Sequence, residues 1–468
     1  MWLKAGEERE DFFGIECTNI DSCFNNVGMK NETEGSHEIN PADAQFLERL
    51  RQHPELRARF QSILELSDNA DGPLRTADEM EERLIQDLRQ LGHTTMNHWA
   101  TQAEQRVGAE LKGADATVRS RKKKTLTWWC VFGLVSVRDR VWRSPHQSYL
   151  RPLPARLGVT SCGRSRRLDR VLTDFGSEHS FARAAGSVQE HYGFEIGVSA
   201  VRHATLEHAQ RARTQLKTHY EQPFRVLPAV GADHVIAQAD GTMICTVQPG
   251  AKKAKRPREW KEMRLVAAQA KGSTTTVYGA TFGSVAETGL RWGHCTRQAG
   301  WGLNSQIHAV GDGAEWIQMQ SREIFGAQAN FLCDYFHVSE YLGAAATICR
   351  PSQPDQWRRT QQKRLKRGAL PQVLASLVEH LEAESTPEAE APVRNAHRYL
   401  SNRLDCLDYP RALALGLPIG SGMIESGHRH VLQARLKKAG AAWLPDHADQ
   451  MAHLRVLKAN HQWLSLWN

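Results

Sequence analysis

The order of secondary-structure patterns between residues 231 and 349 constrains the fold most. Three runs rich in Val, Ile, Thr and aromatic residues come first, at residues 234–248, 263–269 and 273–282. Helical and strand-like periods then alternate, and a helical pattern over residues 337–349 ends the series. Three strands followed by alternating helices and strands predict a mixed five-stranded sheet covered by helices.

Two acidic residues close apolar runs of this sheet. Asp240 follows HVIAQA and Asp312 follows QIHAVG. The element order is the ribonuclease H-like order, which places the first and fourth strands side by side. Adjacent strands lie about 4.8 Å apart, so the two carboxylates could share one divalent ion. A third acid, Glu425, opens a helical pattern in PIGSGMIESGHRHV, where the helix dipole favours a carboxylate.

Each carboxylate taken singly also has a structural explanation. Asp-Gly is a common turn dipeptide, and a glutamate near a helix start needs no further role. The occurrence of all three, in this order and on these elements, favours a shared site. Carboxylate clusters hold pairs of divalent ions in phosphoryl-transfer enzymes.

Composition excludes several classes of protein. The 468 residues are 41% hydrophobic and 24% charged, which is typical of globular domains. The longest apolar run, TWWCVFGLVSV, is too short to span a bilayer, and the N-terminus lacks the apolar region of a secretion signal. The nine cysteines include no CxxC pair, which argues against a thiolate zinc site. We expect a cytoplasmic protein with reduced cysteines and no membrane partner.

The formal charge of +8 is concentrated along one segment. Residues 119–170 contain fourteen Lys and Arg but only two acids. Such a run can be a solvated face or a surface that binds nucleic acid. Within it, residues 124–143 are rich in Trp, Val and Thr around Gly133, which predicts a β-hairpin with a basic face.

The remaining patterns divide the chain into segments with different expected structures. Residues 41–160 are predicted to hold a helical hairpin, with a first helix from Pro41 through Leu64, and then the basic β-hairpin. Residues 161–225 are helical and could form either a helix-turn-helix DNA-binding domain or an ordinary bundle. The full division is a disordered leader at 1–40, then 41–160, 161–225, a first part of the core at 226–349, a helical insertion at 350–415 and the final core helices at 416–468.

The sequence resembles DDE transposases of bacterial insertion sequences, in the ISKra-type group related to Mutator-like elements. The matching motifs are ADGTM, REWKEMRL, GDGAEWI, CDYFHVSEYL and GSGMIESGHRHV. The resemblance covers roughly residues 160–440 and implies a ribonuclease H-like α/β core, interrupted by a helical insertion and preceded by a helical DNA-binding region.

This resemblance implies that Asp240, Asp312 and Glu425 are catalytic and ligate two Mg²⁺ ions, for which Mn²⁺ can substitute. It further implies that Asp334 and His337 lie beside the site and help to handle the DNA strand. For His337, a half-buried helix histidine is an equal alternative. Trp316 and Trp260 could stack on bases, although packing roles are the stronger expectation for both.

Basic residues in several segments are candidate DNA contacts. The insertion GAKKAKRPREWKE follows the strand that carries Asp240, and we expect it to contact the DNA backbone. Arg429, four residues after Glu425, suits a phosphate contact, with a solvent-facing arginine as the alternative. The complete set of expected DNA-binding residues is Lys122, Lys123, Lys124, Arg202, Lys252, Lys253, Lys255, Arg256, Arg258 and Arg429.

The function that the resemblance implies is binding of terminal inverted repeats, followed by DNA cleavage and strand transfer. Cleaving two ends together requires a homodimer or a larger assembly, in a bacterial cytoplasm and associated with the nucleoid. Three alternatives stay open: a structure-selective nuclease of the same fold, a DNA-binding regulator derived from a transposase, and a helical scaffold without metal dependence.

Overall fold

The structure is a computed structural model, and it describes residues 40–68, 76–144, 147–248 and 257–468. The chain divides into two compact units, residues 1–68 and residues 69–468. None of the described helices is long and apolar enough to cross a bilayer. The leader expected at residues 1–40 lies outside the described residues, apart from Asn40.

The described part of the first unit consists of two helices, α1 (Pro41–Gln52) and α2 (Pro54–Asp68). The single helix expected from Pro41 through Leu64 is wrong, because Pro54 divides it. Proline has no N–H to donate and its ring clashes with the preceding turn, so α1 ends at Gln52.

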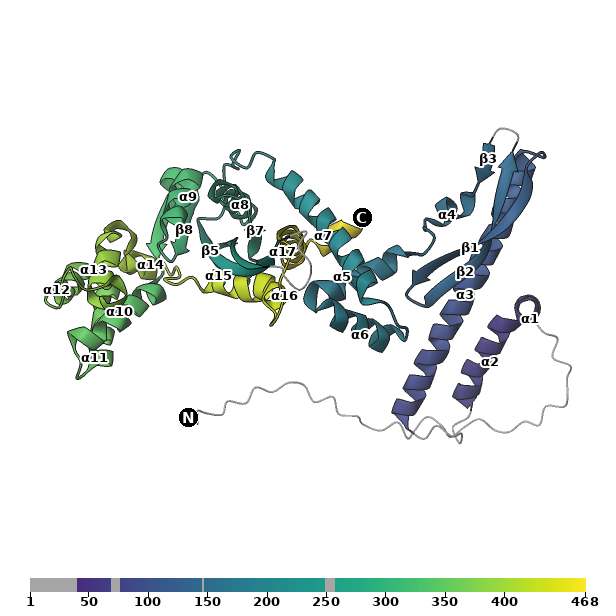
Figure 1. Cartoon of the computed structure of the whole chain (residues 1–468), viewed down its shortest axis with the longest axis horizontal. Helices are drawn as coiled ribbons and strands as arrows, with labels where there is room; N and C mark the ends of the chain where they lie inside the picture. The colour runs from purple at the N-terminus through teal and green to yellow at the C-terminus, as the bar shows by residue number, and fades with distance from the viewer. Residues whose placement is uncertain (1–39, 69–75, 145–146, 249–256) are drawn as a thin grey trace, which may run out of the picture. The chain divides into compact units, whose positions relative to one another are not determined.

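The second unit begins with a long helix and a small sheet (Figure 1). Helix α3 (Ala77–Ala114) starts at a capping box formed by Thr76 and Glu79, and it extends well beyond the helical pattern in the sequence. Since α2 and α3 belong to different units, the expected helical hairpin stays a prediction. The sheet has the order β3-β2-β1-β4, with strands β1 (Arg119–Cys130), β2 (Gly133–Ser144), β3 (Gln147–Leu150) and β4 (Gly163–Arg164).

The predicted β-hairpin is confirmed. Strands β1 and β2 pair in antiparallel register, and Gly133 turns the chain with a φ of 109°. Leu126 and Trp128 pack with Ala103 of α3 in one core, whereas Arg119 to Thr125 are exposed. The basic end of the hairpin is therefore free of the core. A short helix, α4 (Pro152–Leu157), follows β3.

Three helices follow the small sheet: α5 (Arg166–Glu178), α6 (Phe181–Tyr192) and α7 (Val198–Tyr220). Leu172, Val188 and Val201 share their core. Gly193, with a φ of 73°, ends α6 in the left-handed region. Helix α7 also packs along α17 (Pro445–Ala459), so it is anchored at both of its ends rather than projecting freely.

The five-stranded sheet has the order β7-β6-β5-β8-β9. The predicted mixed sheet, with its first and fourth strands (β5 and β8) adjacent, is confirmed. Strands β5, β8 and β9 are parallel, whereas β6 and β7 join in antiparallel register. The strands are β5 (His234–Val247), β6 (Arg258–Ala270), β7 (Val277–Thr281), β8 (Gln306–Gly311) and β9 (Ala329–Cys333). Asp240 does not end its strand, since β5 continues through the Asp-Gly pair to Val247.

Helices cover both faces of this sheet (Figure 1). Helices α8 (Val285–Gln298) and α9 (Glu315–Phe325) pack on the face that carries Ala237 and Ala309. The other face is covered over β5–β7 by α15 (Gly422–Gly427), the π-helix η5 (His428–Gln433), α16 (Ala434–Leu436) and α17. Over β8 and β9 it is covered by α10 (Tyr335–Cys349) and by residues near Leu417.

Residues between Pro354 and Ala414 are helical, as expected of the segment that separates the two parts of the core. They form α11 (Pro354–Lys366), α12 (Leu370–Val378), α13 (Pro392–Ser401) and α14 (Tyr409–Ala414), which share a core with α10. Short 3₁₀ turns complete the unit: η2 (Gly326–Gln328), η3 (Glu388–Glu390), η4 (Leu404–Cys406) and η6 (Trp463–Trp467). The exact segment boundaries given above stay predictions.

Candidate functional site

Asp240 and Asp312 occupy equivalent positions on neighbouring parallel strands. The pairing of β5 with β8 ends at Gln238 opposite Val310, and each aspartate lies two residues further on. Side chains alternate between the faces of a sheet, so Asp240 within β5 and Asp312 directly after β8 are expected on the same face. Both are partly exposed, and Asp240 retains 40% of its side-chain exposure. The sheet thus directs two carboxylates to one edge.

Each aspartate is held by the backbone next to it. Asp240 Oδ1 accepts a hydrogen bond from the N–H of Gly241 at 2.7 Å. Asp312 Oδ1 accepts one from the N–H of Ala314 at 2.8 Å. Since a carboxylate offers about four lone-pair sites, both retain capacity for a cation or another donor.

Residues 420–425, called here the Glu425 segment, are held against β5 by hydrogen bonds from a buried side chain. Gln238 Nε2 donates to the carbonyl of Gly420 at 3.1 Å, and Gln238 Oε1 accepts from the N–H of Ile424 at 2.9 Å. Glu425 follows Ile424 in the first turn of α15 and is exposed. Gln238 therefore links the Glu425 segment to the strand that carries Asp240.

Asp334 anchors the same segment from β9. Its carboxylate is 3% exposed and accepts from the backbone N–H groups of Phe336 and His337, which caps α10. It also accepts from the N–H of Ser421 at 2.8 Å and from the Ser421 hydroxyl. With four donors satisfied, this carboxylate holds α10 and the Glu425 segment together rather than offering itself to an ion.

His337 lies beside Asp334 but makes contacts of its own. Its side chain is 37% exposed, and Nδ1 lies 3.3 Å from a carboxylate oxygen of Glu340. Its ring meets the edge of Tyr399, with the ring centroids 5.8 Å apart. The Tyr399 hydroxyl donates to the backbone carbonyl of Asp312. Tyr399 thus connects His337 with the end of β8.

Tyr399 was not identified from the sequence. It lies on α13, within the helical segment, and stacks on Tyr341 with the ring centroids 4.3 Å apart. Burial raises the pKa of its hydroxyl, so this group stays protonated and able to donate at neutral pH. No local pattern marks this residue, because its contact with Asp312 spans 87 positions of the chain.

His428 was also missed, although a sequence signal exists. It lies three residues after Glu425, and residues at this spacing share one face of a helix. Its Nε2 lies 3.2 Å from Asp240 Oδ2. The side chain is buried, and neither ring nitrogen has a hydrogen bond of good geometry. The Glu-x-x-His spacing could have identified it.

The three predicted ligands approach one edge of the sheet from separate elements. Within the described residues, no group of three His, Cys, Asp or Glu side chains is arranged tightly enough to hold a metal ion. The donors on offer at this edge are carboxylate oxygens of Asp240, Asp312 and Glu425, the ligand type that Mg²⁺ prefers. The donor chemistry fits magnesium, although the three carboxylates do not form a compact ligand set within the described residues.

Part of the chain matches the model of a known protein family. Residues 303–464 match the model of an uncharacterised protein family, UPF0236. The match covers 162 of 468 residues and includes Asp312, Asp334, His337 and Glu425, but not Asp240. No curated protein matches the chain.

The predicted DNA contacts are spread over several elements. Arg258 is the exposed first residue of β6, and Arg429 is exposed on η5. Arg202 is exposed on α7, with a guanidinium nitrogen 3.4 Å from Nδ1 of His447. Lys122, Lys123 and Lys124 are exposed on β1, in a different sheet from the carboxylates. Lys252, Lys253, Lys255 and Arg256 lie outside the described residues.

The two tryptophans have different surroundings. Trp316 is half-buried, and the guanidinium of Arg264 lies 5.4 Å from its ring centroid. This cation–π contact gives Trp316 a packing role. Trp260 on β6 is 59% exposed, so its ring remains available for stacking.

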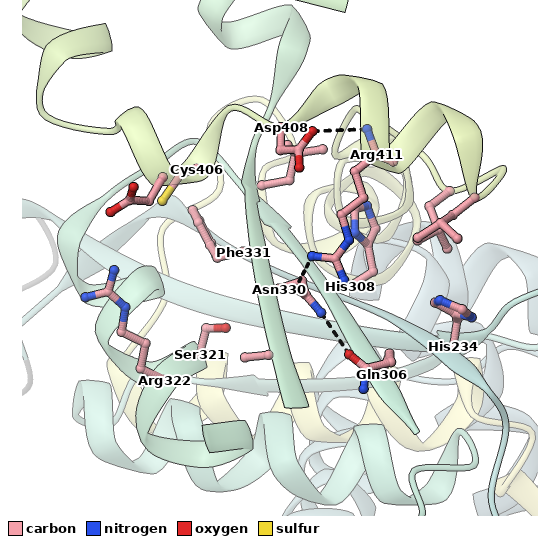
Figure 2. A pocket seen from close by; sticks show the side chains of 16 residues that line it. His234, Gln306, His308, Ser321, Arg322, Asn330, Phe331, Cys406, Asp408 and Arg411 are labelled. Atoms are coloured by element: carbon pink, nitrogen blue, oxygen red, sulfur yellow. Dashed lines mark hydrogen bonds between the residues drawn. The ribbon is translucent and has the colours of Figure 1, made fainter. Parts of the chain in front are cut away.

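A cavity of about 250 Å³ lies at the N-terminal ends of β5 and β8 (Figure 2). His234 and Gln306, the first residues of β5 and β8, line it. Arg411 donates to Asn330, whose amide donates in turn to Gln306 at 3.1 Å. None of the predicted site residues lines this cavity, so it is separate from the carboxylate edge.

Proposed function

We propose that this chain is a DNA transposase of the DDE type, with the five-stranded sheet as its ribonuclease H-like catalytic domain. It hydrolyses a phosphodiester at each end of its element, and the freed 3′-hydroxyl then attacks a phosphodiester of target DNA. The observation that carries this proposal is the equivalent placement of Asp240 in β5 and Asp312 directly after β8, with the Glu425 segment hydrogen-bonded to β5 through Gln238.

In this proposal Asp240, Asp312 and Glu425 hold two Mg²⁺ ions through carboxylate oxygens. When bound, the ions would lower the pKa of an attacking water and stabilise the charge on the departing 3′ oxygen. Gln238 and Asp334 keep the Glu425 segment in position through their hydrogen bonds to residues 420–424. Tyr399 holds the Asp312 backbone through its carbonyl.

The basic residues supply the DNA contacts of the proposal. The exposed Lys122, Lys123 and Lys124 bind backbone phosphates of the terminal inverted repeats, while Arg258 and Arg429 lie on elements of the catalytic domain and bind phosphates there. Two ends are joined in one reaction, so the active species is a homodimer or a larger homo-oligomer. The N-terminal helices and the α5–α7 bundle complete the DNA-binding region.

The proposal is tested with labelled duplexes that carry the DNA flanking the gene, incubated with Mg²⁺ or Mn²⁺. Asp240→Asn keeps the size of the side chain but removes its charge, and we expect DNA binding to persist while cleavage falls at least about 100-fold. Asp233→Asn is the matched control, since Asp233 is an exposed residue immediately before the same strand. Its cleavage rate should equal that of the parent.

Other outcomes identify the alternatives. Nicked products that are never transferred favour a structure-selective nuclease, and DNA binding without any cleavage by the parent favours a regulator. Unchanged cleavage by Asp240→Asn would remove this residue from the mechanism.

A further inference from the structure

We infer that His428 is a positioning residue for Asp240, holding the carboxylate in the orientation in which it receives a divalent cation. This inference rests on the proposed function, because it concerns the same ion site. Its starting point is the 3.2 Å separation between His428 Nε2 and Asp240 Oδ2.

The surroundings of His428 leave Asp240 as its natural partner. The histidine is 3% exposed, and both of its ring nitrogens lack a hydrogen bond of good geometry. A buried polar group without a partner costs free energy, so it is retained where a role offsets that cost. Here one ring nitrogen lies against a partly exposed carboxylate, and a small rotation of either side chain completes the hydrogen bond.

The contact is built into the packing of the backbone. Asp240 pairs with Leu265 across the β5–β6 ladder, and Gly427 lies directly over Leu265. A Cβ at Gly427 would lie 3.0 Å from Leu265 Cδ2 and 2.7 Å from Tyr278 Cε1. The absence of a side chain at Gly427 therefore lets the helix approach the sheet, and the next residue, His428, meets Asp240.

The far end of the π-helix is fixed as well. Arg455 of α17 donates from Nε to the carbonyl of Val431 at 2.5 Å, and it also donates to the carbonyl of His430. The segment from His428 to Val431 is thus held between the sheet and a buried arginine. Short π-helical segments of this kind are often found at functional sites.

The lone pairs of Asp240 allow both contacts at once. Gly241 N–H uses one site on Oδ1, and His428 uses one on Oδ2. Of about four lone-pair sites, two remain for a cation. Partners of this kind, which orient a metal ligand without touching the metal, typically change metal affinity 10–100-fold when they are removed.

The test measures Mn²⁺ binding by titration calorimetry on the full chain, with thermal melting as a check of folding. His428→Leu keeps a similar volume without a donor, and its Mn²⁺ dissociation constant should rise about 10–100-fold. His428→Gln, which restores a donor, should recover part of this loss. His430→Ala is the matched control, because His430 is exposed on the same π-helix, and it should bind Mn²⁺ as the parent does.

Three results would overturn the inference. The first is a folded His428→Leu variant that binds Mn²⁺ as tightly as the parent, while Asp240→Asn binds weakly. The second is a His428→Gln variant no better than His428→Leu, and the third is a directly bonded nitrogen in the pulsed EPR spectrum of bound Mn²⁺. A parent that binds no Mn²⁺, or an Asp240→Asn variant that binds normally, would instead contradict the proposed ion site itself.

Discussion

Gln238 binds the backbone of Ile424 across 186 positions of the chain, with its Oε1 2.9 Å from the Ile424 nitrogen. Its amide nitrogen also donates to the carbonyl of Gly420. Gln238 is 1% exposed; its hydrogen bond to Ile424 is buried, whereas the one to Gly420 is partly buried. The position of the Glu425 segment relative to Asp240 therefore depends on one buried amide.

Replacing Gln238 by leucine should destabilise the fold. Gln238→Leu leaves the buried N–H of Ile424 and the partly buried C=O of Gly420 without these partners, and a fully buried unsatisfied group costs about 1–3 kcal/mol. We expect the free energy of unfolding, measured by urea denaturation, to fall by about 1–4 kcal/mol. The control is Gln372→Leu at an exposed position of α12, which should change it by less than about 0.5 kcal/mol. Equal stability of both variants would contradict the role of Gln238.

Two glycines of the short helix α15 should respond oppositely to alanine. At Gly427 the new Cβ would lie 2.7 Å from the Tyr278 ring, so Gly427→Ala should destabilise by about 1–3 kcal/mol. At Gly422 no atom lies within 4 Å of the new Cβ. Gly422→Ala should therefore stabilise by about 0.4–1 kcal/mol, because it reduces the entropy of the unfolded chain. Thermal or urea unfolding compares the two, and a tolerated Gly427→Ala would refute the close approach.

Glu178 should make stability depend on pH in the acid range. Burial raises its pKa, but hydrogen bonds and charges from Arg455 and Lys458 outweigh this and lower the pKa to about 2. Its stabilising contribution is therefore full above about pH 4.5, the ordinary value, and is lost as the pH falls toward 2. Because the side chain is 39% exposed, solvent screening limits the contribution to about 1–2 kcal/mol.

Urea unfolding at several pH values measures this contribution. Glu178→Gln should be less stable than the parent at pH 7, and the difference should shrink between pH 4.5 and pH 3. Glu190→Gln, at an exposed position of α6, serves as the control and should show no such trend. A difference that stays constant with pH would show that the ion pairs with α17 contribute nothing measurable.

The basic end of the hairpin should contribute to the salt dependence of DNA binding. The logarithm of the DNA-binding constant falls linearly with the logarithm of the salt concentration, and each lysine that neutralises a phosphate makes this slope steeper by about 0.9. Replacing Lys122, Lys123 and Lys124 by alanine should therefore make the slope shallower by up to about 2.7. Fluorescence anisotropy with a labelled duplex at several salt concentrations measures it. Lys363→Ala, at an exposed position of α11, is the control and should leave the slope unchanged. An unchanged slope in the triple variant would show that these three lysines do not contact DNA phosphates.

Local sequence patterns were sufficient to predict much of the fold. The apolar runs predicted the five-stranded mixed sheet, and the Trp- and Val-rich segment around Gly133 predicted the hairpin, because alternation and turn residues act over a few positions. The break at Pro54 was not predicted, although the sequence contains the signal, because a proline in the interior of a helix interrupts it. The pairing of β4 with β1 was not, because β4 has only two residues.

The sequence by itself determined the strands, most of the helices and the order in which Asp240, Asp312 and Glu425 occur. Three contacts were decided only by the tertiary structure. The Asp334 carboxylate accepts hydrogen bonds from the Glu425 segment, the Tyr399 hydroxyl donates to the Asp312 carbonyl, and His428 lies against Asp240. The reason is physical: periodicity records which face of an element is buried, whereas contacts between residues far apart along the chain depend on how those faces pack.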